Sequence, residues 1–295
     1  DLLVNGNSLN VPATDTNTTG GRYKIERYYY TNGTLTSIGH ETRNTAGRGG
    51  SGFWQIIVDG KILVDTSQAS SAPNVPSIAT TCTSNPTAGF AISTYKGNST
   101  DRASIAHNLG STPEMVIVKA RNKSDDWRVY HVGAGNPYYL RLQLTNSQNG
   151  TNNWREMSLN YFALDADSAV NSSSYDYVAY SFSSIEGYSL VSSYQGQNSF
   201  VYCGFRPQFL LIKSATSTEH WAIYDTTRSP SNHADDILKA NSSDDEDFNY
   251  GSGEIDILSN GFKLIGNWGA INHGSAPTYV FLAIAENPFK TARAR

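Results

Sequence analysis

The side chains that could perform catalysis or hold a metal show none of the spacings that such sites need. The six histidines contain no H-x-H or H-E-x-x-H pattern, and the two cysteines form no Cys-x-x-Cys pattern. The acidic run Asp244–Asp247 lacks the D-x-D/N-x-D/N-G order of an EF-hand loop, so we interpret it as a solvated run, with calcium binding as the alternative. No G-x-S-x-G motif is present. The sequence therefore predicts no catalytic residue, metal ligand or cofactor, although composition does not exclude an enzyme.

One glycine-rich stretch, GRGGSG at residues 47 to 52, formally matches the dinucleotide-binding pattern G-x-G-x-x-G. Such a site needs a helix after the glycines, because the pyrophosphate binds at the helix N-terminus. The residues that follow, FWQIIV, have the composition of a strand. We therefore predict a glycine loop here and no nucleotide site.

Aromatic side chains among neutral polar residues are the remaining candidates for chemistry. The chain has 18 tyrosines and 5 tryptophans. An aromatic ring can bind the apolar C–H face of a sugar, while amides and carboxylates bind its hydroxyl groups. Four aromatic residues in loop-like contexts are the predicted glycan-binding residues: Tyr138, Tyr139, Trp154 and Trp268. The alternative is that they are partly buried aromatic residues of long sandwich loops.

Charge and hydropathy argue against two classes of partner. The chain has 22 basic and 26 acidic residues, a net charge of −4, and its basic cluster is confined to the terminal stretch 290–295, which argues against nucleic-acid binding. No apolar run reaches about 18 residues, so we predict no membrane insertion. Cys82 and Cys203 could form one disulfide or remain two buried thiols. The start at Asp1 without Met suggests a processed or partly represented product.

Apolar and polar residues alternate along most of the chain, as in YYLRLQLT at residues 138 to 145. This period of two is typical of strands with one face in water. The sequence FWQIIVDGKILVD places Asp59 and Gly60 between two apolar runs and predicts a hairpin. The one segment with a helical pattern is HADDILKA, residues 233 to 240. The predicted fold class is all-β, with antiparallel β-sandwich domains of jelly-roll type.

Residues 86 to 290 contain the same pattern twice. GSTPEMVIVKARNKSDDWRVYH begins at Gly110 and GFRPQFLLIKSATSTEHWAIYD at Gly204, with five residue types at identical spacing. Each copy, of ~100 residues, is longer than a solenoid repeat and is predicted to be a complete sheet-forming unit. The recurring residues are Gly110, Pro113, Lys119, Trp127 and Tyr130 in the first copy and Gly204, Pro207, Lys213, Trp221 and Tyr224 in the second.

These recurring residues have structural explanations. Gly followed by Pro ends one strand and begins the next, and the Lys closes a core strand with its charge emerging at the strand end. The Trp and Tyr lie on opposite faces of a later strand. Burying one Trp removes roughly 200 Å² from water, which stabilises the fold by several kcal/mol. Core packing therefore explains Trp127 and Trp221 without a ligand.

Residues 66 to 88 hold three prolines among small polar residues, which predicts an extended linker. The predicted layout is an N-terminal β-domain (1–65), the linker (66–88), copy 1 (89–186), copy 2 (187–290) and a tail (291–295). Copy 1 and copy 2 keep these names below.

Further motifs follow one another in order through both copies. They include Pro86–Phe90, His107-x-Leu109-Gly110-x-x-Pro113, Trp127–His131, Ser183–Tyr188, Val201-Tyr202-x-Gly204-Phe205-Arg206-Pro207, Trp221-x-Ile223-Tyr224-Asp225-x-x-Arg228, Leu258–Phe262 and Ala285–Phe289. On these residues the chain resembles a repeated domain of unknown function in virion structural proteins, often tail-fibre-like, of marine bacteriophages including cyanophages. Residues 1 to 65 look like the end of a lectin-like or spacer β-domain.

The resemblance implies a phage structural or adhesin-like protein, with no catalytic residue to carry over. We therefore expect a virion protein on the particle surface, a fibre or surface appendage that attaches to host-surface glycans and contacts other virion proteins. Self-association is expected, with a trimer first by analogy with phage fibres. The alternatives are a capsid or tail decoration protein without a receptor role, and a polysaccharide depolymerase.

Overall fold

The computed structural model describes five short strands before residue 64 and then residues 76–150, 153–197, 200–246 and 251–287. The chain divides into two compact units, residues 1–53 and 54–295. In the first unit, β1 (Leu2–Val4) pairs antiparallel with β2 (Asn7–Leu9) and with β3 (Ile38–His40). Most of the predicted N-terminal domain, the glycine loop at 47–52 and the tail at 291–295 lie outside the described residues.

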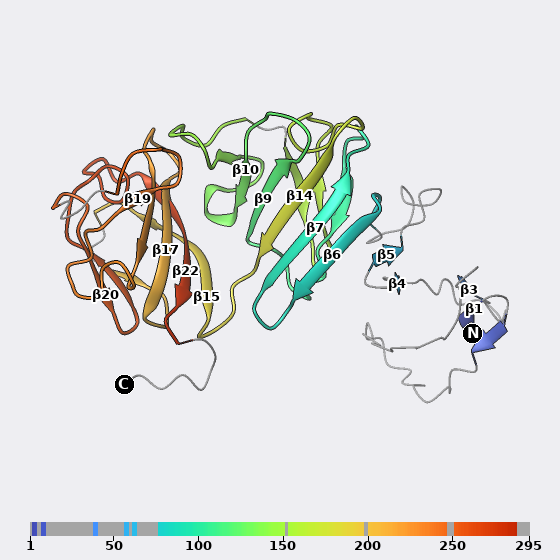
Figure 1. Ribbon diagram of the computed structural model, residues 1–295, viewed down its shortest axis with the longest axis horizontal. Coiled ribbons are helices and arrows are strands. Elements are labelled where there is room, and N and C mark those ends of the chain that lie inside the picture. The colour runs from blue at the N-terminus through green and yellow to red at the C-terminus, as the bar shows by residue number, and fades with distance from the viewer. Residues whose placement is uncertain are drawn as a thin grey trace. The chain divides into compact units, whose positions relative to one another are not determined.

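Copy 1 is a sandwich of a large and a small antiparallel sheet (Figure 1). The described strands of its large sheet follow the order β11 (Leu140–Arg141), β10 (Arg128–His131), β9 (Met115–Ala120), β14 (Asp176–Phe182), β7 (Phe90–Lys96), β6 (Thr80–Asn85), β5 (Lys61–Leu63) and β4 (Ile56–Val58). Its small sheet has the order β12 (Trp154–Met157), β13 (Tyr161–Leu164) and β8 (Ala103–Ala106). A 3-10 turn, η1 (Val132–Ala134), follows β10.

Copy 2 is a second sandwich of the same kind. Its large sheet has the order β15 (Ser189–Gln195), β22 (Thr278–Ala285), β17 (Pro207–Ser214), β18 (Trp221–Asp225) and β19 (Leu238–Lys239). Its small sheet has the order β16 (Phe200–Tyr202), β21 (Gly261–Leu264) and β20 (Ile255–Leu258).

The two sandwiches have the same strand order. Strands β7, β14, β9, β10 and β11 of copy 1 hold the places of β15, β22, β17, β18 and β19, while β8, β13 and β12 hold those of β16, β21 and β20. The predicted all-β sandwich fold with a tandem repeat is thereby confirmed. The described strands of the copies differ at one edge of the large sheet, because β6, β5 and β4 extend it beyond β7 in copy 1, whereas β15 is the last described strand on that side in copy 2.

Each sandwich has its own apolar core, and a third apolar cluster joins the two large sheets. The core of copy 1 includes Phe162 and that of copy 2 the equivalent Phe262. The third cluster brings together Met115 of β9 and Leu211 of β17. Both side chains lie on the face of the strand that points away from its own sandwich core. The layers therefore run small sheet, large sheet, large sheet, small sheet.

A pair of stacked tyrosines recurs in both cores. The ring centroids of Tyr95 and Tyr177 lie 5.2 Å apart, and those of Tyr194 and Tyr279 lie 5.0 Å apart. All four hydroxyls donate to backbone carbonyls of the loop that follows the central small-sheet strand, at Val170, Ser168, Ile271 and Gly269 respectively. Because a buried hydroxyl needs a partner, these bonds fix the same loop in both copies.

The recurring glycines and lysines stabilise turns next to the strands. Gly110 and Gly204 have φ of 72° and 82°, in the left-handed region that glycine adopts without strain. Lys213 is wholly buried, and its Nζ donates to the carbonyls of Ser214 and Ser217. Lys119 likewise donates to two carbonyls of the turn after β9. The prediction that these charges emerge at the strand end is therefore wrong, because the lysines fold back onto the following turn.

The two recurring tryptophans differ in burial. Trp221 is 1% exposed, and its Nε1 donates to the carbonyl of Arg141 in copy 1 at 2.8 Å. Trp127 is half-buried and packs against the cluster that joins the two large sheets. Both rings therefore contribute to the contact between the sandwiches.

The hairpin predicted at Asp59-Gly60 is confirmed, since β4 pairs with β5 across these residues. It extends the large sheet of copy 1 instead of belonging to an N-terminal domain. The predicted linker is also corrected in part, because Thr80–Asn85 forms β6, paired with β5 and β7. The sequence did not predict this strand because its small polar residues show no apolar alternation. Thr80 and Cys82 are nevertheless buried.

The helix predicted at residues 233 to 240 is wrong. Ala234 forms a β-bridge with Ile255, and Leu238–Lys239 is β19. The side chains of Ala234 and Ile237 both lie in the core of copy 2. The strand expected in YYLRLQLT covers only Leu140–Arg141.

Cys82 and Cys203 are both buried free thiols, so the disulfide alternative does not apply. Among the described residues, no helix has the length and apolar character to cross a membrane.

Candidate functional site

Polar groups gather around Trp268, one of the predicted glycan-binding residues. Trp268 follows β21, and its backbone amide donates to the carbonyl of Ser252 at 2.7 Å. Its ring is half-buried against the core of copy 2. The ring is therefore held by the fold while part of it faces solvent.

His220 stacks beside Trp268 and is oriented by an asparagine. The two ring centroids lie 6.5 Å apart with an interplanar angle of 27°. Asn241 donates through Nδ2 to His220 Nδ1 at 3.0 Å, and its Oδ1 accepts the amide of Trp221 at 2.8 Å. Because Nδ1 is an acceptor, Nε2 of the neutral imidazole carries the proton and can donate it to a ligand.

Glu219 brings a carboxylate to the same end of copy 2. A Cβ on Gly269 would lie 2.2 Å from Glu219 Oε1, so the carboxylate packs directly on the backbone next to Trp268. A side chain at position 269 would require the Glu219 carboxylate to move. Glu219, His220, Asn241 and Trp268 together are called the Trp268 site below.

The Trp268 site combines an aromatic face with a carboxylate, an amide and an imidazole. This set suits a sugar, whose C–H face packs on the ring while its hydroxyls bond to the polar groups. No group of three or more His, Cys, Asp or Glu side chains that could hold a metal occurs among the described residues. Asp247, the last residue of the acidic run, lies outside them.

Trp154 does not serve as a surface residue. It is 0% exposed in β12 and packs edge-to-face on Tyr130, with ring centroids 5.8 Å apart. A ligand in solvent cannot reach this ring, so the predicted ligand-binding role of Trp154 is wrong. The sequence around it looked like a loop because β12 is short and carries a bulge.

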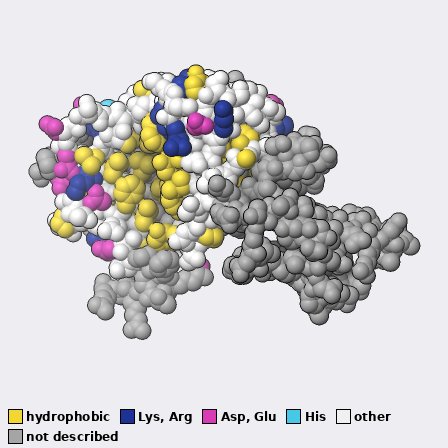
Figure 2. Space-filling view, turned by 45° about the vertical axis from the view of Figure 1, so that its right-hand side comes forward, with side chains coloured by type: hydrophobic (Ala, Val, Ile, Leu, Met, Phe, Trp, Pro, Cys, Tyr) yellow, Lys and Arg dark blue, Asp and Glu magenta, His cyan; other side chains and the backbone are white. Residues whose placement is uncertain are grey.

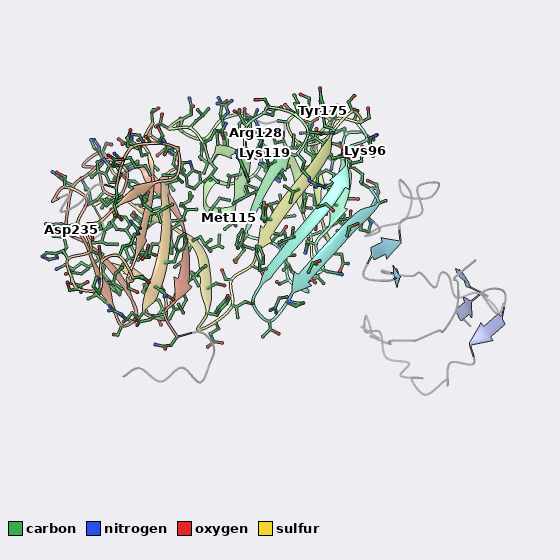
Figure 3. The ribbon with its side chains drawn as sticks, in the orientation of Figure 1. Lys96, Met115, Lys119, Arg128, Tyr175 and Asp235 are labelled. Carbon is green, nitrogen blue, oxygen red and sulfur yellow. The ribbon has the colours of Figure 1, made fainter. Side chains whose placement is uncertain are left out.

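Tyr138 and Tyr139 lie in the loop before β11 of copy 1. Tyr138 is 40% exposed. The ring of Tyr139 is covered by the guanidinium groups of Arg128 and Arg141, whose carbons lie 4.3 and 5.3 Å from its centroid. Figure 3 labels Arg128 near one end of copy 1, close to Lys119. The protein itself therefore occupies a face of Tyr139, while Tyr138 presents an exposed ring.

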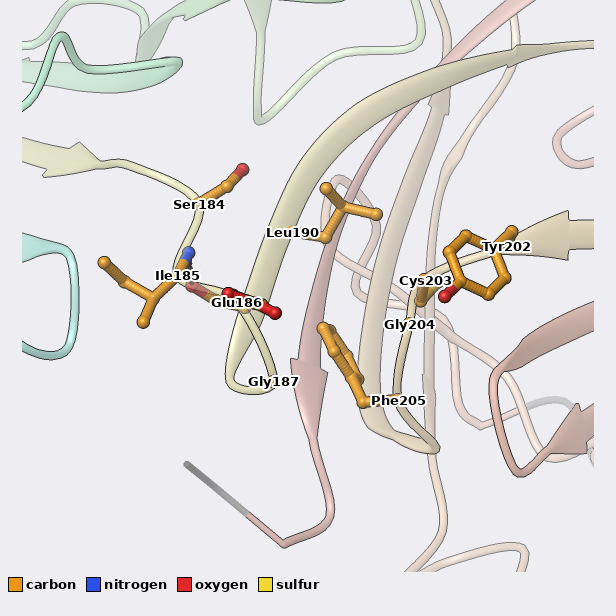
Figure 4. Close-up of a pocket in the computed structure, with 10 residues that line it drawn as sticks. Ser184, Ile185, Glu186, Gly187, Leu190, Tyr202, Cys203, Gly204 and Phe205 are labelled. Carbon is orange, nitrogen blue, oxygen red and sulfur yellow. Dashed lines mark hydrogen bonds between the residues drawn. The ribbon is translucent and has the colours of Figure 1, made fainter. Parts of the chain in front are cut away.

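A pocket that sequence reasoning missed lies where copy 2 begins (Figure 4). It has a volume of about 390 Å³. Leu190, Tyr202 and Phe205 point into a common space, and Glu186 lies at its side (Figure 4). Tyr202 is 66% exposed. Two quoted motifs supply the walls, Ser183–Tyr188 and Val201–Pro207, but their spacing alone did not show that they meet. We call this the junction pocket.

A second cleft, of about 410 Å³, lies between the two large sheets. Phe90 and Phe182 of copy 1 and Leu282 and Ile284 of copy 2 line it. Hydrophobic side chains gather on the face of the molecule shown in Figure 2. The cleft continues the apolar cluster that joins the copies. Leu282 belongs to this cluster, and Phe182 and Ile284 pack against it.

The buried ionisable groups hold the fold. Burial lowers the pKa of His107 and of His131 to about 4 and the pKa of Lys213 to about 8. His131 Nε2 donates to the carbonyl of Phe281 in copy 2, and His107 Nε2 donates to that of Ser158. Burial raises the pKa of the Cys203 thiol to about 12, so it stays protonated and weakly nucleophilic.

Comparison with known proteins identifies a family without assigning a function. The family model described as Domain of unknown function (DUF7483) matches residues 64–288, which include β6, copy 1 and all but the last two residues of copy 2. No curated protein matches the chain, and no solved structure does. A single match that spans both sandwiches agrees with the apolar cluster that joins them. The chain belongs to the DUF7483 family.

Proposed function

We propose that the chain is a bacteriophage virion structural protein, a fibre or surface appendage whose β-sandwiches attach the particle to host-surface glycans. The resemblance of residues 86 to 290 to virion proteins supports the virion part of this proposal. The composition agrees with it, since only 16% of the residues are charged and neutral hydrogen-bonding groups dominate. Its place is the outer surface of the particle.

The Trp268 site is the observation that carries the attachment role. It offers a solvent-facing part of an aromatic ring, and the neighbouring polar groups are already oriented by the protein. A preorganised site loses less entropy when a ligand binds. Neutral sugars are the ligands that this combination fits best, because one carboxylate and one amide can accept and donate to hydroxyls.

The test is the binding of the purified chain to surface polysaccharides isolated from candidate host cells. Trp268→Ala and Glu219→Gln should each weaken binding about tenfold or more, because each removes a central contact. Glu219→Gln is nearly isosteric and keeps the packing on Gly269. Leu159→Ala is the control, since it removes an exposed apolar side chain of copy 1 that belongs to no predicted site, and it should leave binding unchanged.

Other outcomes assign the alternatives. A chain that ignores every host polysaccharide but binds the virion lattice is a decoration protein. Shortening of the polysaccharide, with release of reducing ends, would identify a depolymerase instead. Binding that Trp268→Ala and Glu219→Gln leave intact would contradict the location of the site.

A further inference from the structure

The outer edge of β15 lacks a neighbouring strand among the described residues. At its start, the amide of Ser189 donates to the carbonyl of Ile185 and that of Val191 donates to Ser184 Oγ. Because amides alternate sides along a strand, those of Ser193 and Gln195 point the same way, away from β22. Ser193 and Gln195 are both exposed. The open part of the edge is therefore Ser193–Gln195.

In copy 1 the equivalent edge is covered by the chain itself. Tyr95 pairs with Tyr177 as Tyr194 pairs with Tyr279, so Thr94 is the equivalent of Ser193. Thr94 pairs with Thr81 of β6. Among the described residues, no strand covers this edge of copy 2. The segment before β15 leaves the edge at Ser184, and the strand that precedes it, β14, lies in the sheet of copy 1.

The same covering segment also closes the side of copy 1 between its two sheets. The amide of Ser77 donates to Ser104 Oγ on β8 at 2.8 Å, and Ser104 is 7% exposed. Cys82 of β6 packs in a small apolar cluster with Ala91, Ala106 and Leu109. One extended segment, residues 77 to 85, therefore bridges β8 and β7.

In the part of the chain that the structure describes, no strand covers the equivalent surface of copy 2, which carries larger side chains. The strand register and the alignment of the two copies show which residues are equivalent. Leu190 of copy 2 corresponds to Ala91 of copy 1, Phe200 to Ser104, Tyr202 to Ala106 and Cys203 to Leu109. Phe200 is 40% and Tyr202 is 66% exposed. Leu190, Tyr202 and Cys203 line the junction pocket, which is thus the space that β6 fills in copy 1 (Figure 4).

The composition of β15 also distinguishes it from other edges. Its sequence, SLVSSYQ, has no charge and no proline, and its register with β22 is continuous. The edge strand β19 is two residues long and carries Lys239, and β12 carries Arg155 and a bulge. Short length, charge and bulges are the devices that keep edges from pairing with other chains. Without them, a neutral edge next to exposed aromatic residues is suited to being covered.

We infer that a strand of a second copy of this chain docks antiparallel on the β15 edge at Ser193–Gln195 and covers Phe200, Tyr202 and the junction pocket. The second copy supplies in trans what β6 supplies in cis to copy 1. This chain's own β6, TTCTSN, shows the kind of strand that fits: short, neutral, with small side chains facing the sandwich. The inference concerns assembly and is independent of the glycan site.

The test is the mass of the full chain in solution by light scattering over a wide concentration range. The wild-type chain should show a mass above that of a monomer that falls on dilution. Ser193→Pro removes the outward amide and should leave a monomer, because proline cannot donate to an added strand. Ser193→Ala keeps the amide and is the matched control, expected to associate like the wild type.

A second variant keeps the test independent of any folding defect in Ser193→Pro. Tyr202→Ser changes an exposed side chain and should raise the dissociation constant about tenfold. A wild-type chain that is monomeric at all concentrations would overturn the inference. A multimer whose dissociation constant is unchanged in Tyr202→Ser and Ser193→Pro would overturn it equally.

Discussion

Copy 1 and copy 2 share individual hydrogen bonds in their interiors but differ on their surfaces. Asn171 Oδ1 accepts the amide of Asn98 in copy 1, and Asn272 Oδ1 accepts that of Gln197 in copy 2. The stacked tyrosines and the glycine turns agree equally well. The scaffold therefore accounts for the residues that both copies share.

The differences identify where the copies have separate roles. Asp167 of copy 1 and Trp268 of copy 2 begin the same turn, since the amides of Val170 and Ile271 donate to their carbonyls. The aromatic ring of the Trp268 site is thus specific to copy 2, as is the uncovered β15 edge. In a tandem repeat, residues present in only one copy are better candidates for binding than residues present in both.

The largest expected effect separates the two tryptophans of the joining cluster. Trp221→Ala should lower the free energy of unfolding by about 3–5 kcal/mol, because the ring is fully buried. Trp127→Ala should cost roughly half as much, because part of its ring stays in water. Urea unfolding of both variants measures this, and a larger loss for Trp127→Ala would contradict the burial difference.

Acid should act first on copy 1, which holds both His107 and His131. Their pKa in the folded state, about 4, is below the ordinary 6.5, so the unfolded chain binds more protons between these values. The free energy of unfolding should therefore fall as the pH drops from 6.5 to 4, by roughly 3 kcal/mol for each histidine.

Chemical unfolding at pH 7 and at pH 4.5 checks the acid effect. His273→Gln, which replaces an exposed histidine, is the control. Protonation occurs at His131 Nδ1 and removes the acceptor of the Gly133 amide, whereas Nε2 keeps donating to the carbonyl of Phe281, so the bond lost in acid lies within copy 1. Stability that stays constant between these pH values would refute the buried neutral state of both histidines.

Removing one hydroxyl of the stacked tyrosines should destabilise the two copies equally. Tyr95→Phe and Tyr194→Phe each leave one buried carbonyl without its donor, so each should cost about 1–2 kcal/mol. Thermal unfolding of the two variants makes the comparison. A cost in only one copy would show that the equivalent bonds do not have equivalent weight.

The smallest effect is expected at Tyr202. In dilute protein, Tyr202→Ser should change the free energy of unfolding by less than about 0.5 kcal/mol, since most of the side chain is already in solvent. A loss of several kcal/mol would mean that the ring is part of the core of copy 2.

The sequence predicted the features that depend on local pattern. Alternation of apolar residues indicated an all-β fold, the repeated spacing indicated two equal units, and Asp59-Gly60 indicated a hairpin, because each signal acts between near neighbours. Trp268 was chosen for its loop-like context, but its partners Glu219 and His220 were not, since they come from a distant part of copy 2.

The errors arose where tertiary contacts decide. Trp154 looked like a loop residue, yet the closing of the sandwich buries it completely. Small polar residues in β6 gave no strand signal, although pairing with β7 makes them a strand. The segment HADDILKA had a helical pattern, but pairing with neighbouring strands decides its structure, since Ala234 bridges Ile255 and Leu238–Lys239 forms β19.

Amide hydrogen exchange at two protein concentrations tests the comparison of the two edges most directly. Thr94, paired with Thr81 of β6, should exchange slowly at both concentrations. Ser193 should exchange fast in dilute protein and slowly in concentrated protein, when a second copy covers the β15 edge. Slow exchange of Ser193 even in the most dilute sample would show that the edge is not open, and fast exchange at every concentration would show that no second copy covers it.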